Sequence, residues 1–459
     1  MTILAIALDL GSTSVKAGLL RADGMLTDVV STAPPKLNAS DGRYESDALA
    51  YAREAEQVLA QCLAQTNERP SLGLCSQRSS FLIWDRASGE VLTPLISWQD
   101  TRGACETLRE KEGVIHELSG LCLTPYYFGP KLRVVLQDNP AWRERLECGE
   151  YLVGTLDTFL IWRWTGGKQF VTDASMAART LLMDVKHQCW SSVLCEIFDI
   201  PLNCLAQIIP SVGANIKLDN GLRLQASMGD QSAAFFASVG ADDKAGLVNL
   251  GTGGFVMRGM AQQQAGLDAY LRTLLYQHSD LHVRIALEGT LNSIAAALAD
   301  FPVADCRVED LAKTDILCLA EPSGLGAPYF RKDFGIYFSH TVSHLSPQQI
   351  GALLLEGIIF RVARIVEEFH HASALERIYL SGGLSALACL QQGIAQCVTM
   401  DVYRIMQKET SLQGAALLAA GMVASGEVER INVQATSSAL AQKYQRWKMW
   451  LDELLANKF

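Results

Sequence analysis

ILAIALDLGSTSVKAGLLRADG, residues 3–24, predicts a strand, a glycine turn and a second strand. Small and β-branched apolar residues run up to Asp9, and the chain turns through Gly11-Ser12-Thr13. Near the middle of the chain, AGLVNLGTGGFVMRG, residues 245–259, repeats the pattern. The sequence therefore predicts that the chain begins the same fold twice.

Helical segments follow each of these two starts. Residues 47–65 and 346–371 carry apolar residues at helical spacing with charges between them, and Ser346-Pro347 is a typical helix start. Strands that alternate with such helices indicate an α/β architecture.

The length favours two domains. At 459 residues the chain exceeds the size at which a single hydrophobic core stops growing. The turn before the second start places the boundary near 238–245, which gives an N-terminal domain 1–240 and a C-terminal domain 241–459.

Composition excludes several classes of protein. The net charge of −10, without long runs of one sign, disfavours binding to nucleic acid or to an anionic membrane. No apolar run reaches the length of a membrane span, and Asp9 interrupts the apolar start where a signal peptide stays hydrophobic. The 12 cysteines form no CxxC pair and no zinc-type spacing, so a reducing cytoplasm fits best.

Paired glycine loops point to phosphate binding. The chain has no GxxxxGK[ST] and no GxGxxG after a strand, which disfavours P-loop and Rossmann sites. Glycine lets backbone N–H groups approach phosphate oxygens closely, and Ser and Thr hydroxyls add donors. Two such loops, at 11–14 and 251–253, could therefore converge on one ligand.

Two carboxylates could complete a site for phosphoryl transfer. This chemistry needs held phosphates, a divalent metal and a carboxylate near the acceptor hydroxyl. Asp9 stands beside the first loop and is a candidate for the hydrated metal. Asp230 stands where a strand-like stretch ends at Gly229 and a helix begins with Gln231, so it is either a general base or only a helix N-cap.

At this point the sequence resembles the FGGY family of carbohydrate kinases, and within it the glycerol kinases most closely. The resemblance spans nearly the whole chain and rests on many segments in the family's order. Besides ALDLGSTSVKAG, they are CSQRSSFLIWD (75–85), SWQDTR (97–102), LTPYYFGPKL (123–132), GTLDTFLIWRWTGGKQFVTDASMAARTLL (154–182), GDQSAA (229–234), LGTGGF (250–255), ALEGTLNS (286–293), PSGLGAPYF (322–330), LSGGLSA (380–386) and ETSLQGAALLAAG (409–421).

The resemblance implies two actin-like, ribonuclease H-like ATPase domains with a cleft between them, and ATP and Mg²⁺ as cofactors. It implies that Asp230 is the catalytic base and that Asp9 lies near the metal. The positions that match the family's nucleotide loops are Gly11, Ser12, Thr13, Ser14, Lys16, Gly251, Thr252, Gly253, Gly382, Gly383 and Leu384. Read without the family, Lys16 is a solvated strand charge, and Gly382-Gly383 is a plain helix-initiating turn.

For the acceptor, the resemblance implies a pocket of polar and aromatic residues. The matching positions hold Arg78, Ser79, Trp98, Tyr126, Asp230, Gln231 and Phe255. Ser79 is the one departure, because glycerol kinases have there a glutamate that accepts hydrogen bonds from the substrate. Losing such an acceptor costs about 1.5–3 kcal/mol, so we expect a longer polyol or a ketose to be favoured over glycerol. Trp98 and Phe255, taken alone, fit core aromatics as well.

We therefore expect a cytoplasmic kinase that phosphorylates a hydroxyl of a small sugar or polyol. The alternatives are a true glycerol kinase, a catalytically silent sugar-binding regulator, and an actin-like ATPase without a small-molecule acceptor. We expect neither a nucleic acid nor a membrane as partner. The sequence leaves open the substrate, the hydroxyl that is phosphorylated and the oligomeric state, a homodimer included.

Overall fold

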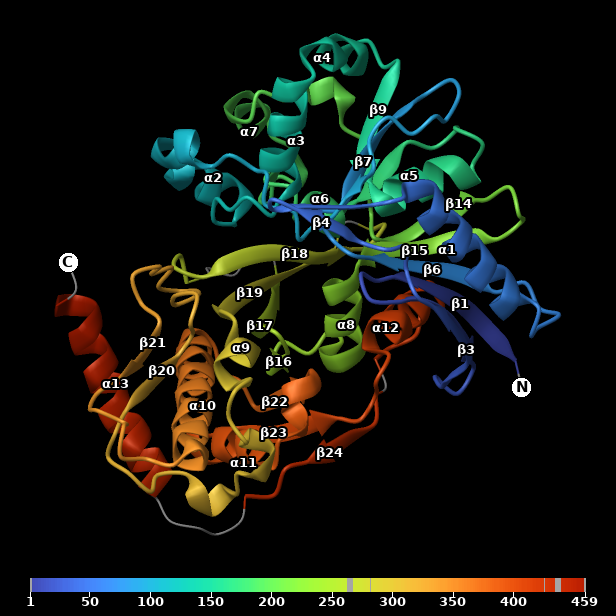
Figure 1. Cartoon of the computed structure of the whole chain (residues 1–459). Coiled ribbons are helices and arrows are strands. Elements are labelled where there is room, and N and C mark those ends of the chain that lie inside the picture. The colour runs from blue at the N-terminus through green and yellow to red at the C-terminus, as the bar shows by residue number, and fades with distance from the viewer. Residues whose placement is uncertain (1, 262–266, 281, 425, 434–438, 458–459) are drawn as a thin grey trace. The chain divides into compact units, whose positions relative to one another are not determined.

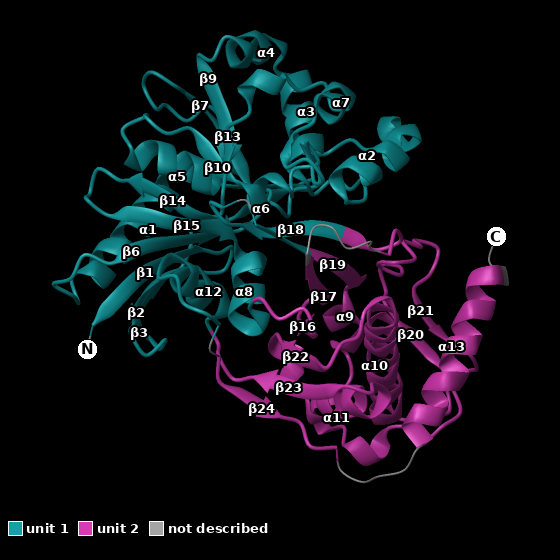
Figure 2. Ribbon diagram, turned by 180° about the vertical axis from the view of Figure 1, so that it is seen from behind, with its two compact units in different colours: residues 1–240, 272–285, 409–425 teal, residues 241–271, 286–408, 426–459 magenta. Residues whose placement is uncertain are grey.

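The computed structural model describes residues 2–261, 267–280, 282–424, 426–433 and 439–457, which fold into two compact units (Figures 1 and 2). Unit 1 consists of Met1–Gly240, Arg272–Ile285 and Glu409–Ser425. Unit 2 consists of Ala241–Leu271, Ala286–Lys408 and Gly426–Phe459. The chain thus first changes unit after Gly240, but a division into 1–240 and 241–459 leaves out the two later segments that belong to unit 1.

A six-stranded sheet forms the centre of unit 1, with the strand order β14-β15-β6-β1-β2-β3. Its strands are β1 (Ile3–Leu10), β2 (Val15–Arg21), β3 (Leu26–Thr32), β6 (Ser71–Ser76), β14 (Val212–Lys217) and β15 (Arg223–Gly229). In β1 every second side chain points to the same face of the sheet, as the two-residue period of a strand requires, and Ile6, Leu8 and Leu10 share one face. They join a buried core with residues of the helices α1 (Ala48–Leu63) and α5 (Leu156–Trp164).

A second sheet of unit 1 has the order β4-β5-β8-β7-β9. Its strands are β4 (Asn38–Ser40), β5 (Arg43–Ser46), β7 (Phe81–Asp85), β8 (Leu95–Ile96) and β9 (Tyr151–Thr155). Two short pairs complete the strands: β10 (Val171–Asp173) with β13 (Gln207–Ile209), and β11 (Met183–Asp184) with β12 (Cys189–Trp190).

The further helices of unit 1 connect and cover these sheets. They are α2 (Glu112–Ser119), α3 (Phe128–Asp138), α4 (Pro140–Glu147), α6 (Ala174–Ala177), α7 (Ser192–Ile197), α8 (Asp230–Val239) and α12 (Thr410–Ala419). α12 is buried along nearly its whole length and packs on α8 and on the strands β1, β6 and β15. This burial explains why residues 409–425 belong to unit 1 although they follow unit 2 in the sequence.

Unit 2 is built on a seven-stranded sheet with the strand order β18-β19-β17-β16-β22-β23-β24. Within this sheet, residues 272–285, which run from β18 into β19, are assigned to unit 1. The strands are β16 (Ala245–Leu250), β17 (Gly254–Ala261), β18 (Leu271–Gln277), β19 (Val283–Leu291), β22 (Arg377–Ser381), β23 (Asp401–Ile405) and β24 (Val428–Arg430). A separate pair consists of β20 (Cys318–Ala320) and β21 (Ile336–Phe338), and the helices are α9 (Ile294–Leu298), α10 (Pro347–Ala372), α11 (Ala388–Cys397) and α13 (Ala439–Asn457).

The two helices expected from the sequence are present. The helix expected over 47–65 is α1, whose N-cap Asp47 accepts a hydrogen bond from the backbone of Ala50. The helix expected over 346–371 is α10, which begins with Ser346 in a capping box and Pro347 in its first turn. Both helices therefore start where local side-chain chemistry satisfies the free N–H groups of the first turn.

The two units repeat one strand arrangement, as the sequence predicted. In unit 1, β1 pairs antiparallel with β2 and parallel with β6, β6 pairs parallel with β15, and β15 pairs antiparallel with β14. In unit 2, β16 pairs antiparallel with β17 and parallel with β22, β22 pairs parallel with β23, and β23 pairs antiparallel with β24. The glycine loop after β1 and the glycine loop after β16 thus occupy equivalent positions.

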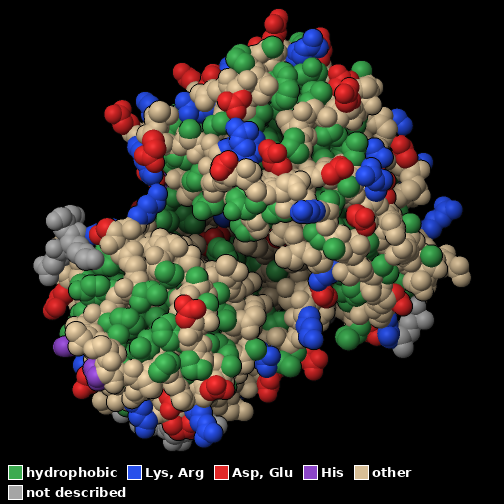
Figure 3. All heavy atoms as spheres, in the orientation of Figure 1, with side chains coloured by type: hydrophobic (Ala, Val, Ile, Leu, Met, Phe, Trp, Pro, Cys, Tyr) green, Lys and Arg blue, Asp and Glu red, His purple; other side chains and the backbone are tan. Residues whose placement is uncertain are grey.

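The surface carries charges of both signs. On the face drawn in Figure 3, acidic and basic side chains are intermixed. Within the described residues, no helix combines the length and the apolar character that crossing a membrane requires.

Candidate active site

Three parallel strands of unit 1 end side by side, and their ends carry the predicted catalytic residues. Asp9 of β1 lies opposite Cys75 of β6, which in turn lies opposite Met228 of β15. Asp230 follows β15 directly, and Arg78 follows β6 two residues after its end. In an open α/β sheet, the carboxyl ends of parallel strands are where ligands bind.

The first glycine loop is closed by its own backbone. The Gly11 N–H donates to the Ser14 carbonyl oxygen at 3.1 Å, and the Tyr51 hydroxyl donates to the Gly11 carbonyl oxygen at 2.6 Å. Ser12 and Thr13 are exposed at the tip. The loop is therefore held from below while its hydroxyls and tip remain available to a ligand.

Asp9 is a carboxylate in an unfavourable environment. Burial, followed by the nearby Asp230, raises the pKa of Asp9 from 3.8 to about 7, while a hydrogen bond with the Cys75 thiol and the charge of Lys16 act in the opposite direction. Its Oδ1 is buried and has no hydrogen-bond partner among the described residues. A cation near Oδ1 would remove this electrostatic cost.

Magnesium fits this environment. Mg²⁺ usually keeps several waters and takes only one or two protein carboxylates together with substrate phosphates. The described residues contain no group of three or more Asp, Glu, His or Cys side chains placed to share a metal. An orphaned, buried carboxylate oxygen beside a glycine loop suits such a sparsely ligated ion.

Lys16 is not the isolated strand charge that its sequence context allows. Its Nζ lies 2.5 Å from Oε2 of Glu409, the residue that precedes α12, and both side chains are partly buried. Sequence reasoning missed Glu409, because 393 positions separate the two residues. In the sequence, Glu409 is marked only by its position at the start of ETSLQGAA, just before an apolar helix.

Asp230 is the first residue of α8, and the N-cap is Gly229. The helix thus begins one residue earlier than predicted, and Asp230 does not cap it. Its Oδ1 accepts a hydrogen bond from the Gln231 N–H at 2.7 Å and lies 3.8 Å from Nε of Arg78. Burial raises the pKa of Asp230 above its ordinary value, and Arg78 opposes this shift.

Arg78 and Gln231 complete this cluster. The Arg78 guanidinium donates to Oε1 of Gln231. A Cβ at Gly229 would lie 2.8 Å from Cδ of Arg78, so glycine is needed there for the arginine to pass. The structure therefore brings together Arg78, Asp230 and Gln231, three of the predicted acceptor residues.

Ser79 lies beside this cluster, but its hydroxyl points elsewhere. Ser79 is buried, has a φ of 62°, and donates from Oγ to the carbonyl oxygen of Arg179 at 2.9 Å. The hydroxyl is therefore already engaged in a hydrogen bond within the protein. Position 79 therefore offers no carboxylate, whereas the resemblance to the glycerol kinases implies a glutamate there.

Trp98 and Tyr126 are surface aromatics rather than core residues. Trp98 is 40% exposed and Tyr126 is 48% exposed. The backbone N–H of Trp98 donates to Oγ of Ser80 at 2.9 Å, which ties it to the Arg78 segment. Gly103 lies against Pro125, the residue before Tyr126. Half-exposed aromatic rings suit contact with the apolar faces of a bound sugar.

In unit 2 the two predicted nucleotide loops follow strands that pair with each other. Asn249 of β16 pairs with Ser381 of β22, so Gly251-Thr252-Gly253 and Gly382-Gly383-Leu384 follow neighbouring parallel strands. The Gly251 N–H donates to the Gly253 carbonyl oxygen at 2.9 Å. This bond closes the loop at 251–253, as the bond from the Gly11 N–H closes the loop of unit 1. Thr252, Gly382 and Gly383 are exposed, and Leu384 is half-buried.

Gly382 has a backbone that only glycine adopts readily. Its φ is 86° and its ψ is 162°, and a Cβ there would lie 2.4 Å from the Leu250 carbonyl oxygen. The helix-initiating turn that follows, Gly383–Ala386, leads to α11. Phe255, the last predicted acceptor residue, is half-buried on β17, where it pairs with Asn249.

Family models match the chain over almost all of its length. The N-terminal domain of the FGGY family of carbohydrate kinases matches residues 4–249, and the C-terminal domain of that family matches residues 246–423. The resemblance found in the sequence is thereby confirmed.

Individual relatives agree with the family match. The chain is 32% identical over 453 residues to a glycerol kinase of Methylobacterium nodulans, with 91% of this chain and 89% of the relative covered. It is 28% identical to an apulose kinase of Pectobacterium atrosepticum, with 97% of each chain covered. The crystal structure of Plasmodium falciparum glycerol kinase with ADP superposes with a TM-score of 0.84 at 21% identity and covers 99% of each chain.

These matches establish the two-domain actin-like, ribonuclease H-like fold and the type of reaction. Members of this family are phosphotransferases that act on hydroxyl groups. The chain belongs to the FGGY family of carbohydrate kinases and is an ATP-binding carbohydrate kinase.

Proposed function

We propose that the chain transfers the γ-phosphoryl group of Mg-ATP to a hydroxyl of a sugar or polyol larger than glycerol. The observation that carries this proposal is Ser79, whose hydroxyl donates to the Arg179 carbonyl oxygen. A pocket with a serine in place of a glutamate has more room and one acidic acceptor fewer. A hydroxyl of glycerol would lose a charged partner in this pocket. We therefore expect the binding free energy of glycerol to be weaker by about 1.5–3 kcal/mol than in a pocket with a glutamate at position 79.

Asp230 is the proposed general base. A base works best when its pKa lies near the working pH, and the raised pKa of Asp230 moves it in that direction. Its Oδ1 is engaged by the Gln231 N–H and faces Arg78, so the other carboxylate oxygen takes the proton of the attacking hydroxyl. Arg78 holds the carboxylate in place and offers its guanidinium to the acceptor's oxygens.

The glycine loops are the proposed phosphate and nucleotide sites. Ser12 and Thr13 in unit 1 and Thr252 in unit 2 offer hydroxyl donors at exposed tips. Asp9 would hold Mg²⁺ through Oδ1, and the ion supplies neutralisation of the phosphate charge. Gly382 and Gly383 let the second nucleotide loop approach its ligand closely.

The acceptor specificity is tested by ADP release from Mg-ATP with glycerol, tetritols, pentitols, ketopentoses, aldonates and ketohexoses. We expect one of the longer acceptors to give a kcat/KM at least about tenfold above that of glycerol, the ratio that about 1.4 kcal/mol produces. A preference for glycerol over all of them would make the chain a true glycerol kinase. Absence of turnover with every acceptor would contradict the proposal.

A further inference from the structure

Lys131 is a buried lysine on the core-facing side of α3. The neighbouring residues of this face, Phe128, Leu132 and Val135, are apolar and buried at the spacing of helical turns. Lys131 lies between them with none of its surface exposed. A charged side chain at such a position needs a specific reason.

The contacts of Lys131 supply this reason. Its Nζ donates to the carbonyl oxygen of Ser79 at 2.8 Å and to the carbonyl oxygen of Ser97 at 2.6 Å, and it lies 5.7 Å from the centre of the Phe81 ring. Burial lowers the pKa of Lys131 to about 7, so the ammonium is held there at an electrostatic cost. A methionine would fill a similar volume without that cost, which indicates that the two hydrogen bonds serve geometry.

These two carbonyl groups belong to the two loops that carry the predicted acceptor residues. Ser79 follows Arg78, and Ser97 precedes Trp98. Between the same loops, the backbone N–H of Trp98 donates to Oγ of Ser80 at 2.9 Å. Lys131 and Ser80 together therefore fasten one loop to the other.

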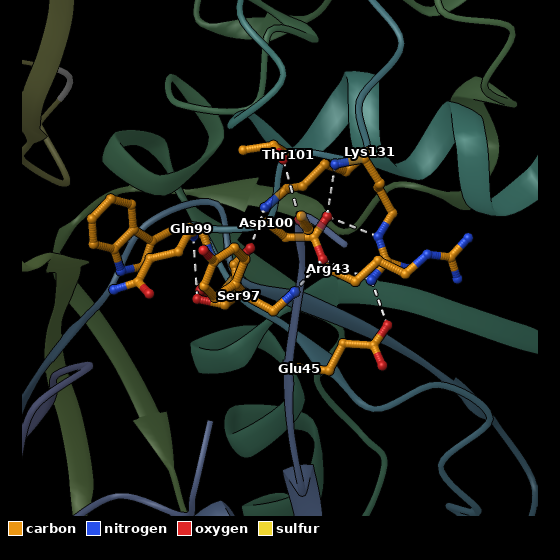
Figure 4. A network of polar contacts seen from close by, with 12 residues as sticks. Arg43, Glu45, Ser97, Gln99, Asp100, Thr101 and Lys131 are labelled. Carbon is orange, nitrogen blue, oxygen red and sulfur yellow. Dashed lines mark hydrogen bonds and ion pairs between the residues drawn. The ribbon is translucent and has the colours of Figure 1, made fainter. Parts of the chain in front are cut away.

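The Trp98 loop is also fixed from its other side, as Figure 4 shows. Asp100 is fully buried and accepts hydrogen bonds from the Tyr44 N–H at 2.8 Å and from Nε of Arg102 at 2.8 Å. Arg102 in turn donates to Glu45. Burial disfavours the charged form of Asp100, but the hydrogen bonds from Arg102 and Tyr44 outweigh it and lower its pKa. The loop from Ser97 to Arg102 is thus held to β5 by hydrogen bonds, and Lys131 links its first residue to Ser79, which follows Arg78.

We propose that Lys131 is a positioning residue for the acceptor, which fastens the Arg78–Ser79 turn to the Ser97–Trp98 turn and so fixes where Arg78 and Trp98 receive the sugar. This inference rests on the proposed acceptor site. It predicts an effect on acceptor affinity that the nucleotide does not share.

The test is the variant Lys131→Met, with the KM values for acceptor and ATP and the melting temperature measured on the full chain. We expect the acceptor KM to rise at least about tenfold, as loss of one charge-assisted hydrogen bond produces, while the ATP KM changes less than about threefold. The matched control is Lys443→Met. Lys443 is an equally buried lysine of unit 2, and its Nζ lies 2.5 Å from Oε2 of Glu356. We expect its loss to lower the melting temperature without raising the acceptor KM.

A second variant keeps the test decisive if Lys131→Met does not fold. Ser80→Ala removes the hydrogen bond that the Trp98 N–H donates to Ser80 Oγ between the same two loops, together with the bond that this hydroxyl donates to Oε1 of Gln77 at 3.1 Å. We expect it to raise the acceptor KM about threefold to tenfold. An unchanged acceptor KM in folded Lys131→Met, or in Ser80→Ala, would overturn the inference while leaving the kinase proposal intact. If the wild-type protein shows no acceptor-dependent ADP release, the proposed function fails, and this inference fails with it.

Discussion

Gly382→Ala tests the geometry of the proposed nucleotide loop. The φ and ψ of Gly382, 86° and 162°, lie in a region that costs other residues about 1–3 kcal/mol. The new Cβ would also lie 2.4 Å from the Leu250 carbonyl oxygen and 2.6 Å from Oδ1 of Asn249, so the backbone must move. Such overpacking adds about 1–3 kcal/mol, and the whole change destabilises unit 2 by about 2–6 kcal/mol.

The assay is thermal unfolding followed by circular dichroism, with Gly383→Ala as the matched control. For a unit of this size, each kcal/mol lowers the melting temperature by roughly 2–4 °C, so we expect a fall of about 4 to 24 °C for Gly382→Ala. A Cβ at Gly383 meets no atom within 4 Å, and its φ is not positive, so that variant changes stability by less than about 0.5 kcal/mol.

The nucleotide affinity provides a second measurement on the same variant. A displaced loop raises the ATP KM of Gly382→Ala by at least about tenfold if the loop lies against the nucleotide. Equal melting temperatures for Gly382→Ala and Gly383→Ala would refute the structural reasoning. A normal ATP KM in a clearly destabilised Gly382→Ala would instead refute the role of the loop in nucleotide binding.

Two further predictions concern the first glycine loop. Asp9 has a pKa raised from 3.8 to about 7, so the native state binds more protons than the unfolded state between these values, and stability falls as the pH rises through that window. Asp9→Asn removes this cost and should stabilise the metal-free protein by about 1–3 kcal/mol at pH 8 and by less at pH 5; an equal gain at both pH values in thermal melts would contradict the assignment. Lys16→Met should raise the ATP KM at least about tenfold, whereas Glu409→Gln leaves the lysine charge in place and should not raise it. The Lys16–Glu409 pair is partly exposed, so Glu409→Gln should change the free energy of unfolding by less than about 1 kcal/mol. Similar ATP KM values for Lys16→Met and Glu409→Gln would argue against a phosphate contact of Lys16.

The parts of the fold that the sequence predicted are those that local pattern determines. The strand, turn and strand units at 3–24 and 245–259 follow from apolar runs interrupted by glycine, and α10 follows from Ser346-Pro347 and the helical spacing behind it. The repeated start predicted the repeated strand order of the two units. These features depend on neighbours in the sequence.

The features that the sequence did not predict depend on distant residues. The return of 409–425 to unit 1 follows from the burial of α12 against β1, β6 and α8, and no local pattern indicates which sheet an apolar helix covers. The bond from Ser79 to the Arg179 carbonyl oxygen spans 100 positions. Lys131 did give a local signal, since it is a charge within the apolar face of a helix.

The candidate site shows the same division. Asp9 and Asp230 could be named because each stands at the end of a predicted strand, and Arg78 could be named only through the family resemblance. Their mutual distances depend on the register of β1, β6 and β15. The acceptor itself depends on side-chain geometry at sub-ångström scale, which neither composition nor spacing encodes.

The most direct test of the account is acceptor-dependent ADP release by the wild-type protein and by Asp230→Asn, with ATP binding measured by calorimetry on both. We predict that the wild type turns over with one class of sugar or polyol. In Asp230→Asn we predict ATP affinity within about threefold of wild type and a kcat lower by roughly 100-fold or more, the contribution of a general base. Near-wild-type turnover in Asp230→Asn would contradict the role of Asp230, and ADP release independent of every acceptor would contradict the proposed function.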